Sequence, residues 1–109
     1  MMLQELAQKL ELTLVTAAFD REVGGVYISD MVSDVIANAK AGDLLVTVQV
    51  HSNVIAAANL LDLCGIVVTQ GKLPTDDVVR IAEKAEIPIY STALNRWQMA
   101  TRLYEAGVR

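Results

Sequence analysis

The alternation of β-rich apolar segments with helical segments is the feature that most constrains the fold of this chain. Its second half predicts strands at residues 44–50, 65–69 and 87–91 and helices at residues 52–63, 75–85 and 95–107. A strand followed by a helix and another strand forms a βαβ unit, and such units cross over with a right hand. Consecutive units build a largely parallel sheet with helices on both faces. The sequence therefore predicts a three-layer α/β/α sandwich.

The first half extends this pattern with less regular elements. Apolar spacing predicts a helix at residues 3–10, a strand at 12–16, a short apolar strand at 26–28 and a helix at 31–39. Several side chains can cap helix starts: Ser29 or Asp30, Ser52, Thr75, and Asn95 with Gln98 as a capping box. No Pro-, Gly- or Ser-rich linker interrupts the chain, so residues 1–109 are expected to form one domain.

Charge and hydropathy exclude several classes of protein. The net charge is -4 and the nine Lys and Arg residues are scattered, which argues against a nucleic-acid-binding surface. No apolar run approaches the roughly 20 residues that a bilayer span needs. The N-terminal segment mixes charges into a helical pattern and lacks the apolar core of a signal peptide. We therefore expect a cytoplasmic protein that binds neither nucleic acid nor membrane.

The chemistry of cofactor and metal sites is also missing from the sequence. One cysteine and one histidine can form neither an internal disulfide nor a Cys/His zinc site. Cys64 lies among apolar residues and is expected to be a buried packing thiol. The P-loop pattern and the dinucleotide fingerprint are both absent. We expect no metal and no cofactor.

Polar side chains follow the predicted parallel strands at the point where each strand ends. Parallel sheets bind ligands outside these carboxyl ends, where helix N-termini present free N–H groups. The candidate ligand-binding residues there are His51, Ser52, Thr69, Gln70, Gly71, Ser91 and Thr92. With Lys72 nearby, a small anionic metabolite or a nucleotide is the expected ligand. Each residue alone is better explained as a helix cap or turn former, so the hypothesis depends on their convergence.

Three hydroxyl groups recur at a constant spacing along the strands. The segments LLVT, IVVT and PIYS repeat every 22 residues and end in Thr47, Thr69 and Ser91. The repeat reflects either the length of one βα unit alone or a line of hydroxyls along one edge of the sheet.

His51 supports an alternative hypothesis, a small enzyme that uses this imidazole as a general base. A recognisable nucleophile does not accompany it, because there is no G-x-S-x-G motif and Cys64 precedes a predicted strand. A third hypothesis is a pure protein–protein adaptor that binds no small molecule.

The predicted helix at residues 52–63 is apolar around almost its whole circumference, whereas a surface helix should show a polar face. Two readings are open. A second copy of the chain covers part of this helix in a homodimer, or the helix lies centrally between neighbours of its own domain.

The loops resemble those of the DRTGG domain family. The segment FDREVGG supplies Asp20 and Arg21, and the stretch from Val67 to Thr92 resembles the second half of the family pattern, with Thr69 and Gly71 in the Thr-Gly-Gly positions. The first of those glycines is replaced by Gln70. A glycine that would end a helix is replaced by Glu86. The replacement at Gln70 raises the question of a positive φ at a side-chain-bearing residue.

The resemblance implies a fold like the N-terminal domain of HPr kinase/phosphorylase. It also implies a regulatory or dimerising module without an activity of its own, since such domains occur in phosphotransacetylases and beside CBS domains in regulatory pyrophosphatases. Free-standing versions are associated with hydrogenase gene clusters, which implies a redox-enzyme partner. Two roles stay open for Asp20 and Arg21: ligand binding, and a structural role that their adjacent opposite charges indicate without the family. In the structural role we expect the Asp20 carboxylate to accept backbone amides of the loop at residues 69–72.

Overall fold

The structure is a computed structural model that describes residues 1–109. Its five strands are β1 (Thr13–Leu14), β2 (Gly25–Ile28), β3 (Asp43–Thr47), β4 (Gly65–Val68) and β5 (Ile89–Ser91). They form one sheet in the order β1-β5-β4-β3-β2. Strands β2 to β5 are parallel to one another, whereas β1 pairs antiparallel with β5. The largely parallel sheet is thereby confirmed, and the strand order that the sequence left open is settled.

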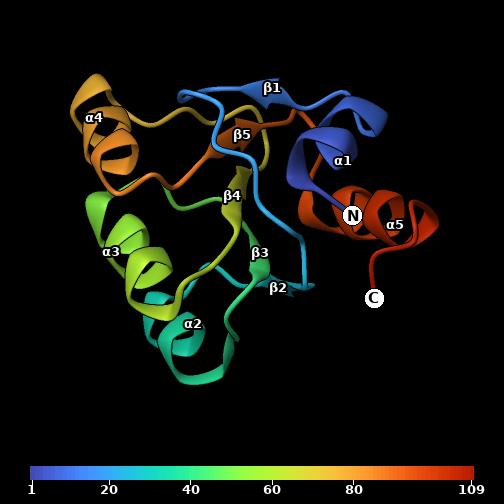
Figure 1. The fold of residues 1–109 in the computed structure, drawn as a ribbon, viewed down its shortest axis with the longest axis horizontal. Coiled ribbons are helices and arrows are strands. Elements are labelled where there is room, and N and C mark those ends of the chain that lie inside the picture. Colours follow the sequence, from blue (N-terminus) through green and yellow to red (C-terminus); the bar gives the residue numbers. More distant parts are fainter.

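Helices cover both faces of the sheet and complete the three predicted layers (Figure 1). They are α1 (Leu3–Lys9), α2 (Val32–Asn38), α3 (Ser52–Leu61), α4 (Asp76–Lys84) and α5 (Arg96–Glu105). From β2 to β5, each crossover steps to the adjacent strand in the same direction. Crossovers of one hand then place α2, α3 and α4 on the same face. The other face is covered by α1 and α5, which come from the two ends of the chain.

The core is divided by the sheet into two clusters. Along β3, Leu44 and Val46 point toward α1 and α5, while Leu45 points toward α2, α3 and α4. All three side chains are fully buried. Burial on both faces explains why the central strands are continuous apolar runs instead of alternating sequences.

The apolar helix α3 lies between α2 and α4 on one face of the sheet (Figure 1). Its Val54, Ile55, Ala57 and Ala58 are buried in the core of this domain. The central position within its own domain therefore accounts for most of its apolar surface. Leu60 is the large apolar side chain that remains open to solvent, 71% exposed.

The capping residues expected from the sequence are confirmed in part. Asn95 accepts a hydrogen bond from the Gln98 amide, and the Gln98 side chain accepts from the Asn95 amide, so the capping box of α5 is present. The prediction for Ser52 is wrong, because this residue begins α3 and His51 occupies the N-cap position. Thr75 is the N-cap of α4, but its side chain makes no capping hydrogen bond.

Two side-chain-bearing residues adopt left-handed backbone conformations where the resemblance expected glycine. Gln70 has a φ of 61° and Glu86 a φ of 57°. A left-handed conformation costs an L-residue roughly 1–2 kcal/mol. The loop geometry that glycines would favour is therefore kept here at an energetic cost.

None of the five helices has the length and apolar character that crossing a membrane requires.

Candidate functional site

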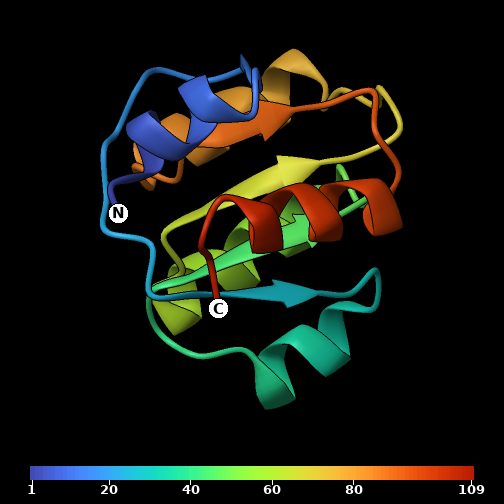
Figure 2. The ribbon, with the colours of Figure 1, turned by 90° about the vertical axis from the view of Figure 1, so that its right-hand side faces the viewer.

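The loops that follow the parallel strands meet at one edge of the sheet. In Figure 2 this is the edge toward which the arrowheads of β2 to β5 point. The Gln70 amide donates to the Leu94 carbonyl over 2.9 Å, and the Gly71 amide donates to the Thr92 carbonyl over 2.9 Å. The loop after β4 and the loop after β5 are thus joined by backbone hydrogen bonds, as their expected convergence requires.

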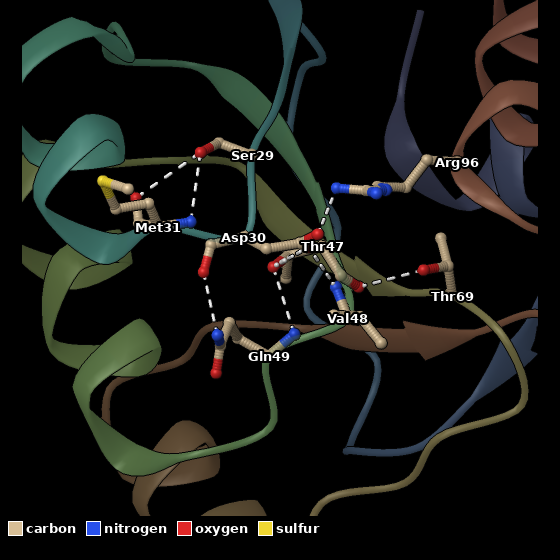
Figure 3. A network of polar contacts seen from close by, with 8 residues as sticks. All are labelled: Ser29, Asp30, Met31, Thr47, Val48, Gln49, Thr69 and Arg96. Carbon is tan, nitrogen blue, oxygen red and sulfur yellow. Dashed lines mark hydrogen bonds and ion pairs between the residues drawn. The ribbon is translucent and has the colours of Figure 1, made fainter.

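A carboxylate at the end of β2 organises this edge (Figure 3). Asp30 Oδ1 accepts hydrogen bonds from the Val48 amide over 2.8 Å and from Thr47 Oγ1 over 3.2 Å. Its Oδ2 forms an ion pair with Nη1 of Arg96. The Asp30 carbonyl accepts from Gln49 Nε2 over 2.8 Å. Asp30 therefore ties the loops after β2 and β3 to the first residue of α5.

A surface cavity of about 560 Å³ lies beside this network. It is lined by residues from β2, the loop after β4 and the start of α5: Ile28, Gln70, Asn95, Arg96, Trp97 and Ala100. A guanidinium group and two carboxamides give the cavity donors for an anion, and the Trp97 indole gives it a flat apolar surface. The ion pair with Asp30 restricts the position of the guanidinium at the rim.

Two of the three repeated hydroxyl groups, those of Thr47 and Thr69, serve the backbone and neighbouring loops. Thr69 Oγ1 donates to the Thr47 carbonyl over 3.5 Å, and Thr47 Oγ1 accepts from the Gln49 amide over 3.1 Å. Thr47 and Thr69 are fully buried, and Ser91 is buried as well. Thr92 Oγ1 accepts from the Leu94 amide over 3.2 Å. The residues of this repeat shape the edge, and the cavity is lined by other side chains.

His51 and Ser52 lie at the same edge, at the start of α3, and both are exposed. Neither residue lines the cavity beside α5. Neither side chain makes a hydrogen bond in the structure, so no partner orients the imidazole. This part of the edge offers no catalytic pair.

The segment between β1 and β2 passes along the opposite, amino-terminal edge of the sheet (Figure 2). Asp20 and Arg21 belong to this segment, and Arg21 donates to carbonyls of residues 63 and 86, shortly before β4 and β5 begin. The expectation that Asp20 binds amides of the loop at residues 69–72 is wrong. Its Oδ1 accepts from the Gln4 amide over 2.9 Å, which satisfies a free N–H in the first turn of α1.

Arg21 bridges the ends of α3 and α4. Its Nη2 donates to the Glu86 carbonyl over 2.8 Å and its Nη1 to the Leu63 carbonyl over 3.2 Å. An ion pair of 3.4 Å joins it to Asp62. Since carbonyls at helix C-termini lack intrahelical partners, a guanidinium is suited to hold these two loops together. The structural role weighed for Asp20 and Arg21 is thus present, with partners other than those expected.

Replacing Arg21 with methionine is expected to lower the free energy of unfolding by about 1–2 kcal/mol, because carbonyls of two loops lose a charged donor. Urea unfolding monitored by circular dichroism measures this change. The matched control is Arg102→Met on α5, an exposed arginine without a side-chain hydrogen bond, expected to change stability by less than about 0.5 kcal/mol. Equal effects of the two substitutions would contradict the bridging role.

The sequence reasoning missed the residues that line and brace the cavity. The sequence pattern predicts Asp30 only as a helix cap and assigns no role to Arg96 or Trp97. One signal was present: Ser29 and Asp30 also follow an apolar strand, so a fourth strand end belonged to the same edge. Arg96 follows the capping residue Asn95 directly, which places a cation at a helix start.

Comparison with known proteins identifies a matching family model and solved structures that resemble this fold. The model of the DRTGG domain matches residues 5–106. A similar solved structure contains the CBS and DRTGG domains of the regulatory region of Clostridium perfringens pyrophosphatase, complexed with its activator diadenosine tetraphosphate. The two structures superpose with a TM-score of 0.73 at 15% sequence identity. The superposed region comprises 93% of this chain but only 45% of that chain. The chain thus spans less than half of that regulatory region, and the likeness concerns the fold. No curated protein matches the chain.

Proposed function

Because the chain belongs to the DRTGG domain family, we propose that it is a regulatory domain that binds a small anionic metabolite or a nucleotide in the cavity beside α5. The observation that carries this proposal is the composition of the cavity, where Arg96, Gln70 and Asn95 surround the exposed ring of Trp97. The cavity also lies at the carboxyl edge, the usual ligand position in open parallel sheets.

Each wall of the cavity suits one part of a nucleotide. A guanidinium has five N–H donors in a planar fork, so Arg96 can contact a phosphate while it keeps its ion pair with Asp30. An exposed indole offers a stacking surface for a base, an interaction worth roughly 1–3 kcal/mol per base in single-stranded nucleic-acid complexes. Carboxamides such as those of Gln70 and Asn95 donate to and accept from the polar edge of a base.

The related regulatory region supports the choice of ligand class. The pyrophosphatase fragment was crystallised with diadenosine tetraphosphate, which carries both purine bases and phosphates. For the present chain this makes adenine nucleotides the first compounds to test. The enzyme hypothesis gains nothing from the cavity, because His51 does not line it. A redox-enzyme partner and a cytoplasmic location stay predictions from the sequence.

The proposal predicts that a nucleotide or phosphorylated metabolite raises the melting temperature and changes the fluorescence of Trp97, the only tryptophan of the chain. A ligand at about 100 times its Kd stabilises the folded state by about 2.7 kcal/mol. Thermal-shift screening finds the compound, and titration of the intrinsic fluorescence measures its Kd. Since Trp97 is 75% exposed, quenching of its emission reports directly on contact with the ring.

Substitution of Arg96 with glutamine is expected to weaken that ligand about tenfold or more, since charge-assisted hydrogen bonds contribute about 1.5–3 kcal/mol. The matched control is Arg80→Gln, an exposed arginine on α4 that pairs with an aspartate of its own helix. It should leave the Kd unchanged. A panel without any stabilising compound, or equal losses in both variants, would count against the proposal.

A further inference from the structure

An aromatic stripe on α5 has no partner within the domain. Trp97 is 75% exposed and Tyr104 is 63% exposed. They are seven positions apart in the sequence, so they lie on one face of the helix, with Ala100 and Thr101 between them. The stripe borders a groove of about 540 Å³ that is mostly apolar. Exposed aromatic surface of this kind marks interaction sites more often than ordinary protein surface.

The layer that contains the stripe is incomplete. Three helices cover one face of the sheet, whereas α1 and α5 alone cover the other. Figure 2 shows that neither of them extends over β2, which is the last strand of the sheet. Ile28 of β2 is 38% exposed and lines the ligand cavity together with Trp97 and Ala100. The stripe, the cavity and the face of β2 therefore form one continuous surface.

We propose that a second copy of this chain covers the stripe by packing its own α5 antiparallel to the first. Two-fold symmetry requires a surface that is complementary to itself, and the residues of the stripe are arranged symmetrically about the midpoint between Ala100 and Thr101. In the pair, Trp97 of one copy lies opposite Tyr104 of the other. The small residues Ala100 and Thr101 meet at the centre, where they allow the helices to approach closely.

The charges around the stripe fit this pairing. The four residues of the stripe are uncharged, so no like charges are brought together at its centre. Glu105, the charged residue that also lines the groove, comes to lie opposite Arg96 of the second copy in the symmetric pair. Antiparallel packing also places the positive end of each helix dipole beside the negative end of the other. The Arg109 guanidinium lies 3.8 Å from the centroid of the Tyr104 ring. In the pair it lies near the facing Trp97 as well, which is a favourable position for a cation.

The area of the stripe predicts a weak dimer. A buried aromatic side chain contributes roughly 150–250 Å², so the two aromatics with their small neighbours supply about half of the roughly 800 Å² per partner of a standard interface. Ile28 and the polar residues at the rim supply only part of the remaining buried area. A reversible dimer with a micromolar Kd is the expected result.

The second copy also completes the ligand cavity. Trp97 and Ala100 line both the groove and the cavity, so a facing α5 forms a further wall beside them. A ligand held between the two copies then strengthens their association, and association strengthens ligand binding by the same factor. This coupling rests on the proposed function, whereas the dimer itself does not.

Sedimentation velocity without ligand tests the dimer over about 5–500 µM, a range chosen to bracket a micromolar Kd. The mass is expected to rise from 11.8 kDa toward twice that value. Thr101→Arg places a charge at the centre of the contact, on an existing helical surface, and should weaken association at least tenfold. Trp97→Ala should weaken it by about the same factor. The matched control is Leu60→Arg, which changes the exposed leucine of α3 and should leave association intact.

A monomer at the highest concentration would overturn the inference, as would loss of the dimer in Leu60→Arg alone. Association to a mass other than a dimer would overturn it too. If Thr101→Arg abolishes the dimer while no nucleotide binds either form, the inference stands and the proposed function fails. If a nucleotide binds wild type and Thr101→Arg with equal Kd, the proposed function stands and the coupling is refuted.

Discussion

Replacing Asp30 with alanine is expected to lower the free energy of unfolding by about 2–4 kcal/mol, the largest loss that we predict for a single polar residue of this chain. The substitution removes the acceptor of the Val48 amide and of the Thr47 hydroxyl. Thr47 is fully buried, and a buried donor that loses its acceptor costs about 1–3 kcal/mol. The ion pair with Arg96 contributes less, because the two side chains are 25% and 48% exposed.

Chemical denaturation with urea measures this loss, and two variants separate its causes. Asp30→Asn keeps an oxygen for the Val48 amide but removes the charge that faces Arg96, so it should cost about half as much. Asp77→Ala removes the exposed partner of Arg80 on α4 and should change stability by less than about 0.5 kcal/mol. A loss for Asp30→Ala as small as that for Asp77→Ala would show that Asp30 does not brace this edge.

Asp30 also limits how freely Arg96 can serve a ligand. A free arginine on a helix surface occupies many rotamers, and ordering it upon binding costs up to about 2 kcal/mol. The ion pair with Asp30 restricts these rotamers before any ligand arrives. We therefore expect one carboxylate to stabilise the fold and to pre-organise the cavity, so the two effects of its removal should appear together.

The architecture was predictable because local signals agreed with one another over much of the chain. The helix at Arg96–Glu105 begins where Asn95 and Gln98 form a capping box, and the apolar strands β3 to β5 lie where the 22-residue repeat placed them. The strand order was not predictable in the same way. It depends on which strand ends come to lie beside each other, and periodicity within a strand carries no information on its neighbour.

The convergence of the loops at one edge was predictable for the parallel strands, whereas the expected place of Asp20 beside them is wrong. The loops after β4 and β5 converge because their strands run in the same direction. The strand β1 instead runs antiparallel to β5, so β1 ends at the opposite edge, where the parallel strands begin. Alternating apolar residues indicate a strand but not its direction. The family pattern includes residues from both loops, but it does not say where they lie in the fold. Residues of one motif can lie at opposite edges of a sheet, so the resemblance did not correct the expectation for Asp20.

Cys64 is expected to react with a thiol reagent such as Ellman's reagent about a thousandfold more slowly than an ordinary cysteine at pH 8. Its side chain is 2% exposed beneath α1, at the beginning of β4. Burial, reinforced by the negative charge of Asp43, raises the pKa of the Cys64 thiol to about 12. An ordinary thiol has a pKa of about 8.5, and the thiolate is the reactive form. At pH 8 the thiolate fraction is then about 10⁻⁴ compared with roughly a quarter.

Absorbance at neutral to mildly alkaline pH follows the reaction, with the urea-unfolded chain as the control that should react at the ordinary rate.

The raised pKa of Cys64 also makes the free energy of unfolding depend on pH. The folded state keeps the proton that the unfolded chain releases above pH 8.5, so this contribution is complete below that pH and is lost as the pH rises through about 12. Cys64→Ala should remove that component of the alkaline decline. Rapid labelling of the folded protein would show instead that α1 leaves the sheet frequently, because access to Cys64 requires the separation of Leu3 and Leu6 from β4.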